Sequence, residues 1–85
     1  MIQTVLKRDG RVVGFNEEKI ATAIRKAMLH TDKGEDLQLI HQITDRISFK
    51  GDSQMTVEAI QDLVEVELMK SSRKDVAQKY IAPQE

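Results

Sequence analysis

A basic segment near the beginning of the 85-residue sequence carries the side chains best suited to bind an anion. Residues 7–10 read Lys-Arg-Asp-Gly, and Asn16 and Lys19 follow a few positions later. A cation about 4 Å from a phosphate gains roughly 4 kcal/mol at an effective dielectric constant near 20, before desolvation and salt screening reduce the gain. Two or three such cations together could hold a triphosphate. On spacing alone, a charged turn exposed to solvent stays open as the alternative.

The other side chains offer little for catalysis or for metal binding. The sequence has no cysteine, only two histidines (His30 and His41), and no Gly-rich phosphate loop of the G-x-x-x-x-G-K-[ST] type. Neither histidine has a carboxylate at the spacing of a metal site, so both are expected at the surface or at a helix end. We therefore expect no catalytic residue and no metal site, and a chain that is not itself an enzyme.

Length and composition indicate one small domain spanning residues 1–85. Two fifths of the residues are apolar, which suffices for one modest core. The net charge of −1 argues against a nucleic-acid partner, because domains that bind nucleic acids usually carry a clear excess of basic residues. Residues 1–30 are nevertheless locally basic, with six Lys and Arg against three Asp and Glu. No apolar run approaches the roughly 20 residues of a membrane span, and the first residues do not form a signal peptide. A cytoplasmic location is expected.

The basic segment lies between two β-prone runs, residues 4–8 and 11–15, which predicts a β-hairpin with a two-residue turn at Asp9-Gly10. In that register Leu6 pairs with Val13 and Thr4 with Phe15, so that Leu6, Val13 and Phe15 share one face. Neighbouring strand residues point to opposite faces. Lys7 and Arg8 would therefore both reach one ligand only if the strand twists or the ligand wraps its edge.

Four apolar stripes with helical spacing follow the hairpin. Asn16 is a good N-cap for a helix over residues 17–29, and a second stripe runs from Leu37 to Ile47. Thr56 caps a third helix that buries Ile60, Leu63, Val64 and Leu68 and leaves Glu58, Asp62, Glu65 and Glu67 mostly outside. The segment 72–75 opens a fourth helix, which Pro83 stops. The fold class is α+β: a small four-helix bundle capped by an N-terminal β-hairpin, to which Gln54-Met55 could add an edge strand.

Two long stretches of the sequence resemble the ATP-cone, a nucleotide-sensing domain. The first combines residues 5–10 (Val-Leu-Lys-Arg-Asp-Gly) with residues 13–20 (Val-Gly-Phe-Asn-Glu-Glu-Lys-Ile), and the second is residues 56–65 (Thr-Val-Glu-Ala-Ile-Gln-Asp-Leu-Val-Glu). The resemblance covers nearly the whole chain. The residues Leu68-Met69 and Tyr80-Ile81 look most like the cone at the amino end of an anaerobic (class III) ribonucleoside-triphosphate reductase.

The resemblance implies a site for ATP or dATP, with Mg²⁺ as the ion that accompanies a triphosphate. The positions that match the family's binding residues are Lys7 and Arg8 for the phosphates, Val5, Phe15 and Ile20 around the adenine, Asn16 and Lys19 at the base and the helix start, and Val57 and Gln61 near the sugar. After residue 81 the family continues with an aromatic residue and an arginine. Ala82-Pro83-Gln84-Glu85 stands there instead, so a phosphate-binding cation could be missing.

The function that the resemblance implies is allosteric regulation of deoxyribonucleotide synthesis. ATP would switch the parent oxidoreductase on and dATP would switch it off, usually by changing how subunits associate. The implied partners are the catalytic domain of the same parent chain and a nucleotide-dependent oligomer. Two alternatives stay open: an interaction or oligomerisation module that keeps the cone fold without the ligand, and the cone of a reductase-gene repressor. The repressor is disfavoured because its zinc ribbon requires cysteines.

Overall fold

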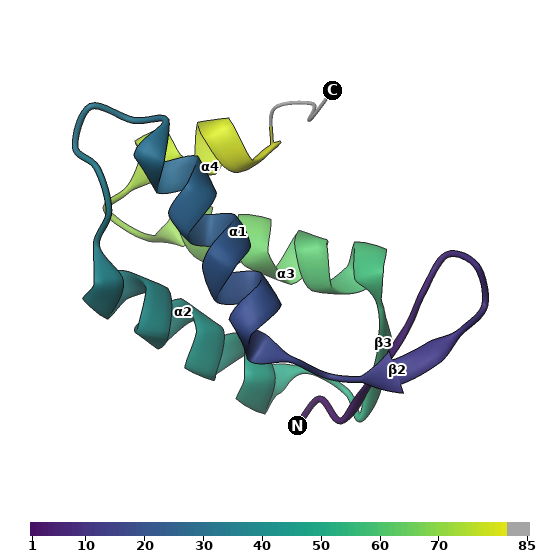
Figure 1. Ribbon diagram of the computed structural model, residues 1–85. Coiled ribbons are helices and arrows are strands. Elements are labelled where there is room, and N and C mark those ends of the chain that lie inside the picture. The colour runs from purple at the N-terminus through teal and green to yellow at the C-terminus, as the bar shows by residue number, and fades with distance from the viewer. Residues whose placement is uncertain (82–85) are drawn as a thin grey trace.

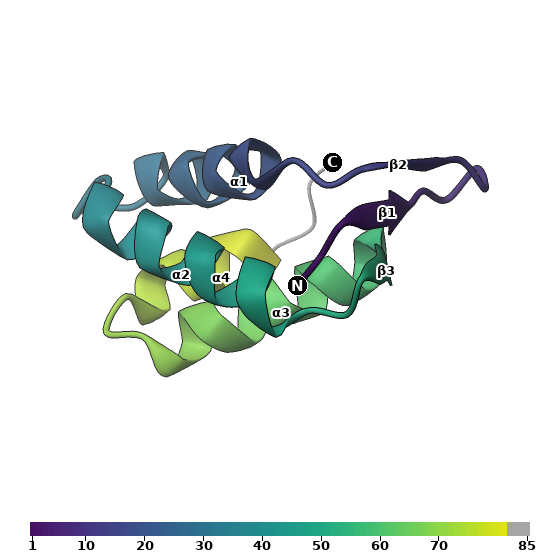
Figure 2. The same cartoon turned by 90° about the horizontal axis from the view of Figure 1, so that it is seen from below.

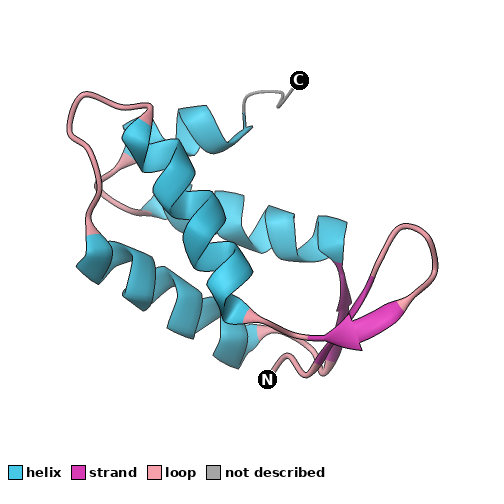
Figure 3. Cartoon of the chain, viewed as in Figure 1, coloured by secondary structure: helices cyan, strands magenta, loops and turns pink. Residues whose placement is uncertain are grey.

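Short strands and helices follow one another along residues 1–81, the part of the chain that the computed structural model describes (Figures 1 and 3). The elements are β1 (Thr4–Leu6), β2 (Val12–Gly14), α1 (Glu17–Leu29), α2 (Leu37–Lys50), β3 (Gln54–Thr56), α3 (Val57–Lys70) and α4 (Lys74–Ile81). The α+β prediction is confirmed, including the edge strand at Gln54-Met55. The predicted stop at Pro83 lies outside the described residues. No helix of residues 1–81 is both long enough and apolar enough to cross a membrane.

The three strands form a mixed sheet at one end of the helical bundle (Figures 1 and 2). β1 lies in the centre, antiparallel to β2 and parallel to β3. The strands are only three residues long, and so small a sheet needs packing against other elements to be stable. β3 leads directly into α3, and β2 is followed by α1 after two residues. The sheet therefore fixes where the amino ends of these two helices lie.

The turn between β1 and β2 is one residue longer than predicted. The Lys7 N–H donates to the Arg11 carbonyl oxygen at 2.8 Å, which leaves three residues in the loop. A two-residue type I′ turn would need positive φ at both Asp9 and Gly10. Only Gly10 adopts one, at 89°. Asp9 instead uses its carboxylate to accept the Arg11 N–H at 3.1 Å, so the turn requires a single left-handed residue.

The longer turn shifts the pairing of the strands by one residue. Thr4 lies opposite Gly14, Val5 opposite Val13 and Leu6 opposite Val12, so the predicted Leu6–Val13 and Thr4–Phe15 pairs are wrong. Paired residues share a face of the sheet. Val5 therefore takes the place beside Val13 that was predicted for Leu6.

The starts of α1 and α3 match the sequence prediction because each depends on a local cap. The Asn16 side chain accepts the Glu18 N–H at 3.0 Å at the beginning of α1, and the Thr56 hydroxyl accepts the Ala59 N–H at 3.1 Å at the beginning of α3. Such caps satisfy N–H groups that have no partner within the helix. As a result α1 begins only two residues after β2, the second strand of the hairpin.

Each helix packs against two others: α1 contacts α2 and α4, and α3 also contacts α2 and α4. Their buried sides meet in one core, whose most enclosed side chains are Ile24, Met28, Ile43, Ile47, Leu68, Val64 and Val76. Leu37 and Leu63 depart from the predicted stripes. Leu37 is exposed, and Leu63 is half-buried at the edge of the core. The bundle places the amino ends of α1 and α3 beside the sheet.

Glu67 was predicted to lie mostly outside, and this is wrong. Its side chain is 5% exposed and accepts a hydrogen bond from Arg46 Nη1 at 2.7 Å and another from Lys50 Nζ at 3.4 Å. Both cations come from α2, so the carboxylate links α2 to α3. Burial opposes ionisation of this carboxyl, but the two hydrogen bonds outweigh it and lower its pKa.

At the end of the bundle opposite the sheet, the α1–α2 connection lies beside the turn before α4 (Figures 1 and 2). The buried Arg73 joins them. Its Nη2 donates to the Gly34 carbonyl oxygen at 2.8 Å and to the Thr31 hydroxyl at 3.1 Å, while its Nε donates to Asp75 at 3.1 Å. These bonds hold the start of α4 against the end of α1.

Candidate functional site

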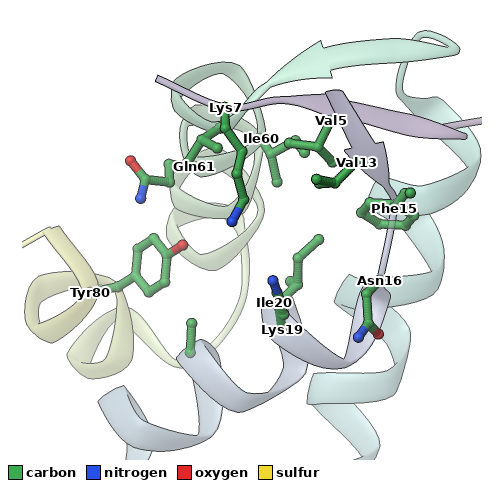
Figure 4. Close-up of a pocket in the computed structure, with 13 residues that line it drawn as sticks. Val5, Lys7, Val13, Phe15, Asn16, Lys19, Ile20, Ile60, Gln61 and Tyr80 are labelled. Carbon is green, nitrogen blue, oxygen red and sulfur yellow. The ribbon is translucent and has the colours of Figure 1, made fainter. Parts of the chain in front are cut away.

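A pocket of about 200 Å³ opens where the sheet meets the amino ends of α1 and α3, with α4 on its far side (Figure 4). The lining residues come from five elements and their connections. They are Val5, Lys7, Val13, Gly14, Phe15, Asn16, Lys19, Ile20, Ala23, Val57, Ile60, Gln61 and Tyr80. Eight of the nine binding residues predicted from the sequence are among them, and Arg8 is not.

One end of the pocket is apolar. Val5 and Val13 approach from paired positions of the sheet, Phe15 follows Val13 on the same face, and Ile20 and Ile60 rise from the first turns of α1 and α3 (Figure 4). Ile20 and Ile60 are buried, whereas Val5, Val13 and Phe15 are half-buried. Half-buried apolar side chains around an open space are suited to contact the flat faces of a heterocyclic base.

Two ammonium groups enter the same pocket from opposite sides. Lys7 extends from the end of β1 and Lys19 from the first turn of α1, and their side chains point toward one another (Figure 4). No carboxylate of residues 1–81 forms an ion pair with either lysine, whereas Arg8 and Arg11 are paired with Glu58 and Asp9. The pocket therefore carries positive charge that the described acidic residues do not neutralise at close range.

Arg8, the residue after Lys7, lies in the turn and does not line the pocket. Its Nε is 3.5 Å from Glu58 Oε1 in the first turn of α3, and both side chains are more than half exposed. The observed register places Lys7 on the face of Val5, whereas Arg8 is the first residue of the turn and lies beside Glu58. The structure thus brings Lys7 and Lys19 together and leaves Arg8 outside the pocket.

The remaining predicted residues lie at the rim and on one wall. The Asn16 side-chain oxygen is occupied as the N-cap of α1, which leaves its amide N–H groups as the donors that a ligand could use. Val57 and Gln61 share one face of α3, four residues apart, and line the wall nearest α4. Gln61 is the more exposed of the two and offers both a donor and an acceptor.

Five lining residues were not predicted as site residues: Val13, Gly14, Ala23, Ile60 and Tyr80. Helical and strand spacing could have indicated three of them. Val13 is two residues from Phe15 on the strand, Ala23 is three from Ile20, and Ile60 is three from Val57. Tyr80 is different, because only the packing of α4 against α1 and α3 brings it to the pocket.

Comparison with known proteins agrees with this arrangement. The family model of the ATP cone domain matches residues 3–84, nearly the entire chain. The chain belongs to the ATP-cone family. The amino half of the cone supplies β1, β2, the turn and Lys19, and its later half supplies β3 and the α3 and α4 walls.

Several reductases contain a segment similar to this cone. A vitamin B12-dependent ribonucleoside-diphosphate reductase of Thermoplasma acidophilum is 42% identical over 88 residues, which cover 95% of this chain and 11% of that protein. The ribonucleoside-diphosphate reductase subunits alpha of Chlamydia pneumoniae and Chlamydia trachomatis are each 35% identical over 91 residues, covering 94% and 92% of this chain and 9% of each relative. The cone thus spans about a tenth of the length of these relatives.

Proposed function

We propose that this cone binds ATP or dATP in the pocket and regulates a ribonucleotide reductase of which it forms a part. The observation that carries the proposal is the pair of lysines, Lys7 and Lys19, facing an apolar pocket without an ion-pair partner among residues 1–81. An apolar end beside unneutralised cations matches a molecule that joins a flat base to a polyanion. Adenine nucleotides have that chemistry.

The size of the pocket suggests how the nucleotide lies in it. Sites that enclose drug-sized ligands measure roughly 300–1,000 Å³, and this pocket measures about 200 Å³. We therefore expect the base to be enclosed between Val5, Phe15 and Ile20, with the sugar and the triphosphate extending past Lys7 and Lys19. Mg²⁺ would bind to the phosphates, because a hard cation prefers oxygen ligands and often shares them with substrate phosphates.

The proposed role of the parent protein rests on the relatives and on the resemblance described above. The three relatives act, by their names, on ribonucleoside diphosphates, and one depends on vitamin B12. These relatives therefore do not support the anaerobic triphosphate reductase in particular, the class that the residues Leu68-Met69 and Tyr80-Ile81 resemble. Membership of that class stays a prediction, and the coding sequence next to this segment would test it through the presence or absence of a glycyl-radical domain.

Binding itself is testable with this chain. Tyr80 is its only tyrosine and there is no tryptophan, so tyrosine fluorescence reports from the pocket wall alone. We expect ATP and dATP each to change this fluorescence saturably, with matching heats in isothermal titration and a higher apparent affinity when Mg²⁺ is present. A folded sample that gives neither heat nor a fluorescence change at millimolar nucleotide would refute the proposal.

Exposed apolar side chains favour the second candidate, a module for association with other protein surfaces. Phe49 is 74% exposed on α2, and Val66 and Met69 lie exposed three residues apart on α3. Light scattering separates the two functions. Association that is the same with and without dATP favours the second candidate, whereas association only after dATP is added favours nucleotide regulation.

A further inference from the structure

The pocket contains a polar group outside the set of predicted binding residues, the hydroxyl of Tyr80. The ring is half-buried and packs against the hydrophobic core from α4. Its hydroxyl lines the pocket, and no hydrogen bond joins it to any residue within 1–81. A phenol is both donor and acceptor, so this hydroxyl is free to bond with a ligand.

Three polar groups from three separate elements converge on one space. The amines of Lys7 and Lys19 point into it from β1 and α1, and the Tyr80 hydroxyl points into it from α4 (Figure 4). The apolar side chains Val5, Val13 and Phe15 lie at the opposite end. A ligand with its base at that end would place its charged part between the lysines, within the region that the hydroxyl faces.

The hydroxyl is a donor at neutral pH. Burial of the ring raises the pKa of Tyr80, and the negative charge of Glu65 raises it further. A protonated phenol can donate to an anionic oxygen, and such bonds are roughly twice as strong as those between neutral groups. The charged side chains that line this space are those of Lys7 and Lys19, whereas Glu65 acts on Tyr80 from outside the set of lining residues.

We propose that the Tyr80 hydroxyl donates a hydrogen bond to a phosphate oxygen of the nucleotide held by Lys7 and Lys19, and that this bond ties α4 to the occupied pocket. The inference rests on the proposed function and adds one specific contact to it. Apart from this bond, α4 is held by its packing against α1 and α3 and by Arg73 at its far end. The nucleotide would thus link β1, α1 and α4 through its phosphates.

The test uses Tyr80→Phe, which removes the hydroxyl and keeps the ring. Isothermal titration of the wild-type chain and the variant with ATP and with adenosine separates a phosphate contact from contacts to the base or sugar. We expect ATP to bind about tenfold more weakly to the variant, the effect of one charge-assisted hydrogen bond, and adenosine affinity to change less than twofold. An unchanged ATP affinity, or equal losses for ATP and adenosine, would overturn the inference.

Hydrogen exchange gives a second measurement that does not depend on affinity. With saturating ATP, the amides of α4 should be protected in the wild-type chain and lose most of that added protection in Tyr80→Phe, while α1 stays protected in both. Equal protection of α4 in the two proteins would contradict the proposed hydrogen bond between Tyr80 and the nucleotide. If the wild-type chain fails to bind ATP at all, the proposed function fails, and that result is visible without the variant.

Discussion

Arg8 Nε lies 3.5 Å from Glu58 Oε1, so of two adjacent cations on the hairpin one faces a carboxylate and the other, Lys7, faces the pocket. The division follows from the hairpin, because Lys7 continues the register of the first strand on the face of Val5, whereas Arg8 is the first residue of the turn. The turn geometry decides which of the two points inward. A two-residue turn would have paired Leu6 with Val13 and placed Lys7 on the face away from Val13.

The first prediction separates these two cations. Lys7→Ala should weaken ATP binding by about tenfold or more, because it removes a cation that no described carboxylate neutralises. Arg8→Ala should weaken it less than about threefold, because an exposed ion pair contributes little and already satisfies the guanidinium. Isothermal titration at two salt concentrations checks both, and adenosine binding should be unaffected. Equal losses would show that Arg8 leaves Glu58 and joins the phosphates, as the family resemblance implies.

The elements that the sequence predicted well are those with local causes. Asn16 and Thr56 cap their helices through side-chain bonds that span two or three residues, so their positions follow from residue type and spacing alone. The hairpin was predicted for the same reason. Its register was not, because both two-residue and three-residue turns are common in hairpins, and the length here depends on whether Asp9 adopts positive φ or accepts the Arg11 N–H through its carboxylate.

Other features depend on contacts between distant segments and have no local signal. Glu67 is buried because Arg46 and Lys50, about twenty residues earlier, reach it from α2. Tyr80 reaches the pocket because α4 packs on α1 and α3. Spacing within one helix can identify an apolar stripe, but it cannot show which neighbouring helix will supply a charge or which wall an aromatic residue will join.

The second prediction concerns the difference between ATP and dATP, which is a single 2′-hydroxyl. Gln61 is the polar side chain on the α3 wall where the resemblance places the sugar, and its amide can both donate to and accept from a hydroxyl. Gln61→Leu should therefore lower ATP affinity several-fold and leave dATP affinity within about twofold. Parallel titrations measure the ratio. Val57→Ala, on the same wall without a polar group, is the control and should change both affinities equally.

The third prediction is a pH dependence of stability from Glu67. Its pKa in the folded chain lies below the ordinary value of 4.5, because the hydrogen bonds from Arg46 and Lys50 outweigh the effect of burial. A lowered pKa contributes stability above pH 4.5, and this contribution is lost as the pH falls through the folded-state pKa. At pH 7, Glu67→Gln should reduce the free energy of unfolding by about 1–2 kcal/mol.

Urea unfolding at several pH values checks this contribution. The difference in unfolding free energy between the wild-type chain and Glu67→Gln should shrink as the pH falls below 4.5. Asp62→Asn, at an exposed site on the same helix, provides the control and should change stability by less than about 0.5 kcal/mol at pH 7. A difference that stays constant down to acidic pH would contradict a role for the ionised Glu67 carboxylate.

The last prediction concerns Arg73, at the end of the bundle opposite the pocket. Its guanidinium donates to the Gly34 carbonyl, the Thr31 hydroxyl and Asp75, and its side chain is only 10% exposed. Arg73→Ala should lower the free energy of unfolding by about 2–3 kcal/mol, because it leaves these partly buried acceptors without their donor. Thr31→Val should cost less, since it removes one acceptor of Arg73 and the bond from the Thr31 hydroxyl to the Met28 carbonyl oxygen but keeps the bonds of Arg73 to Gly34 and Asp75. Lys79→Ala, exposed on α4, should be nearly neutral.

Because Arg73 lies far from the lysines, ATP should bind to the folded fraction of Arg73→Ala with nearly wild-type affinity at low temperature. A loss of ATP affinity as large as that of Lys7→Ala, in a variant that circular dichroism finds folded, would mean that the placement of α4 against α1 controls the pocket from its far end.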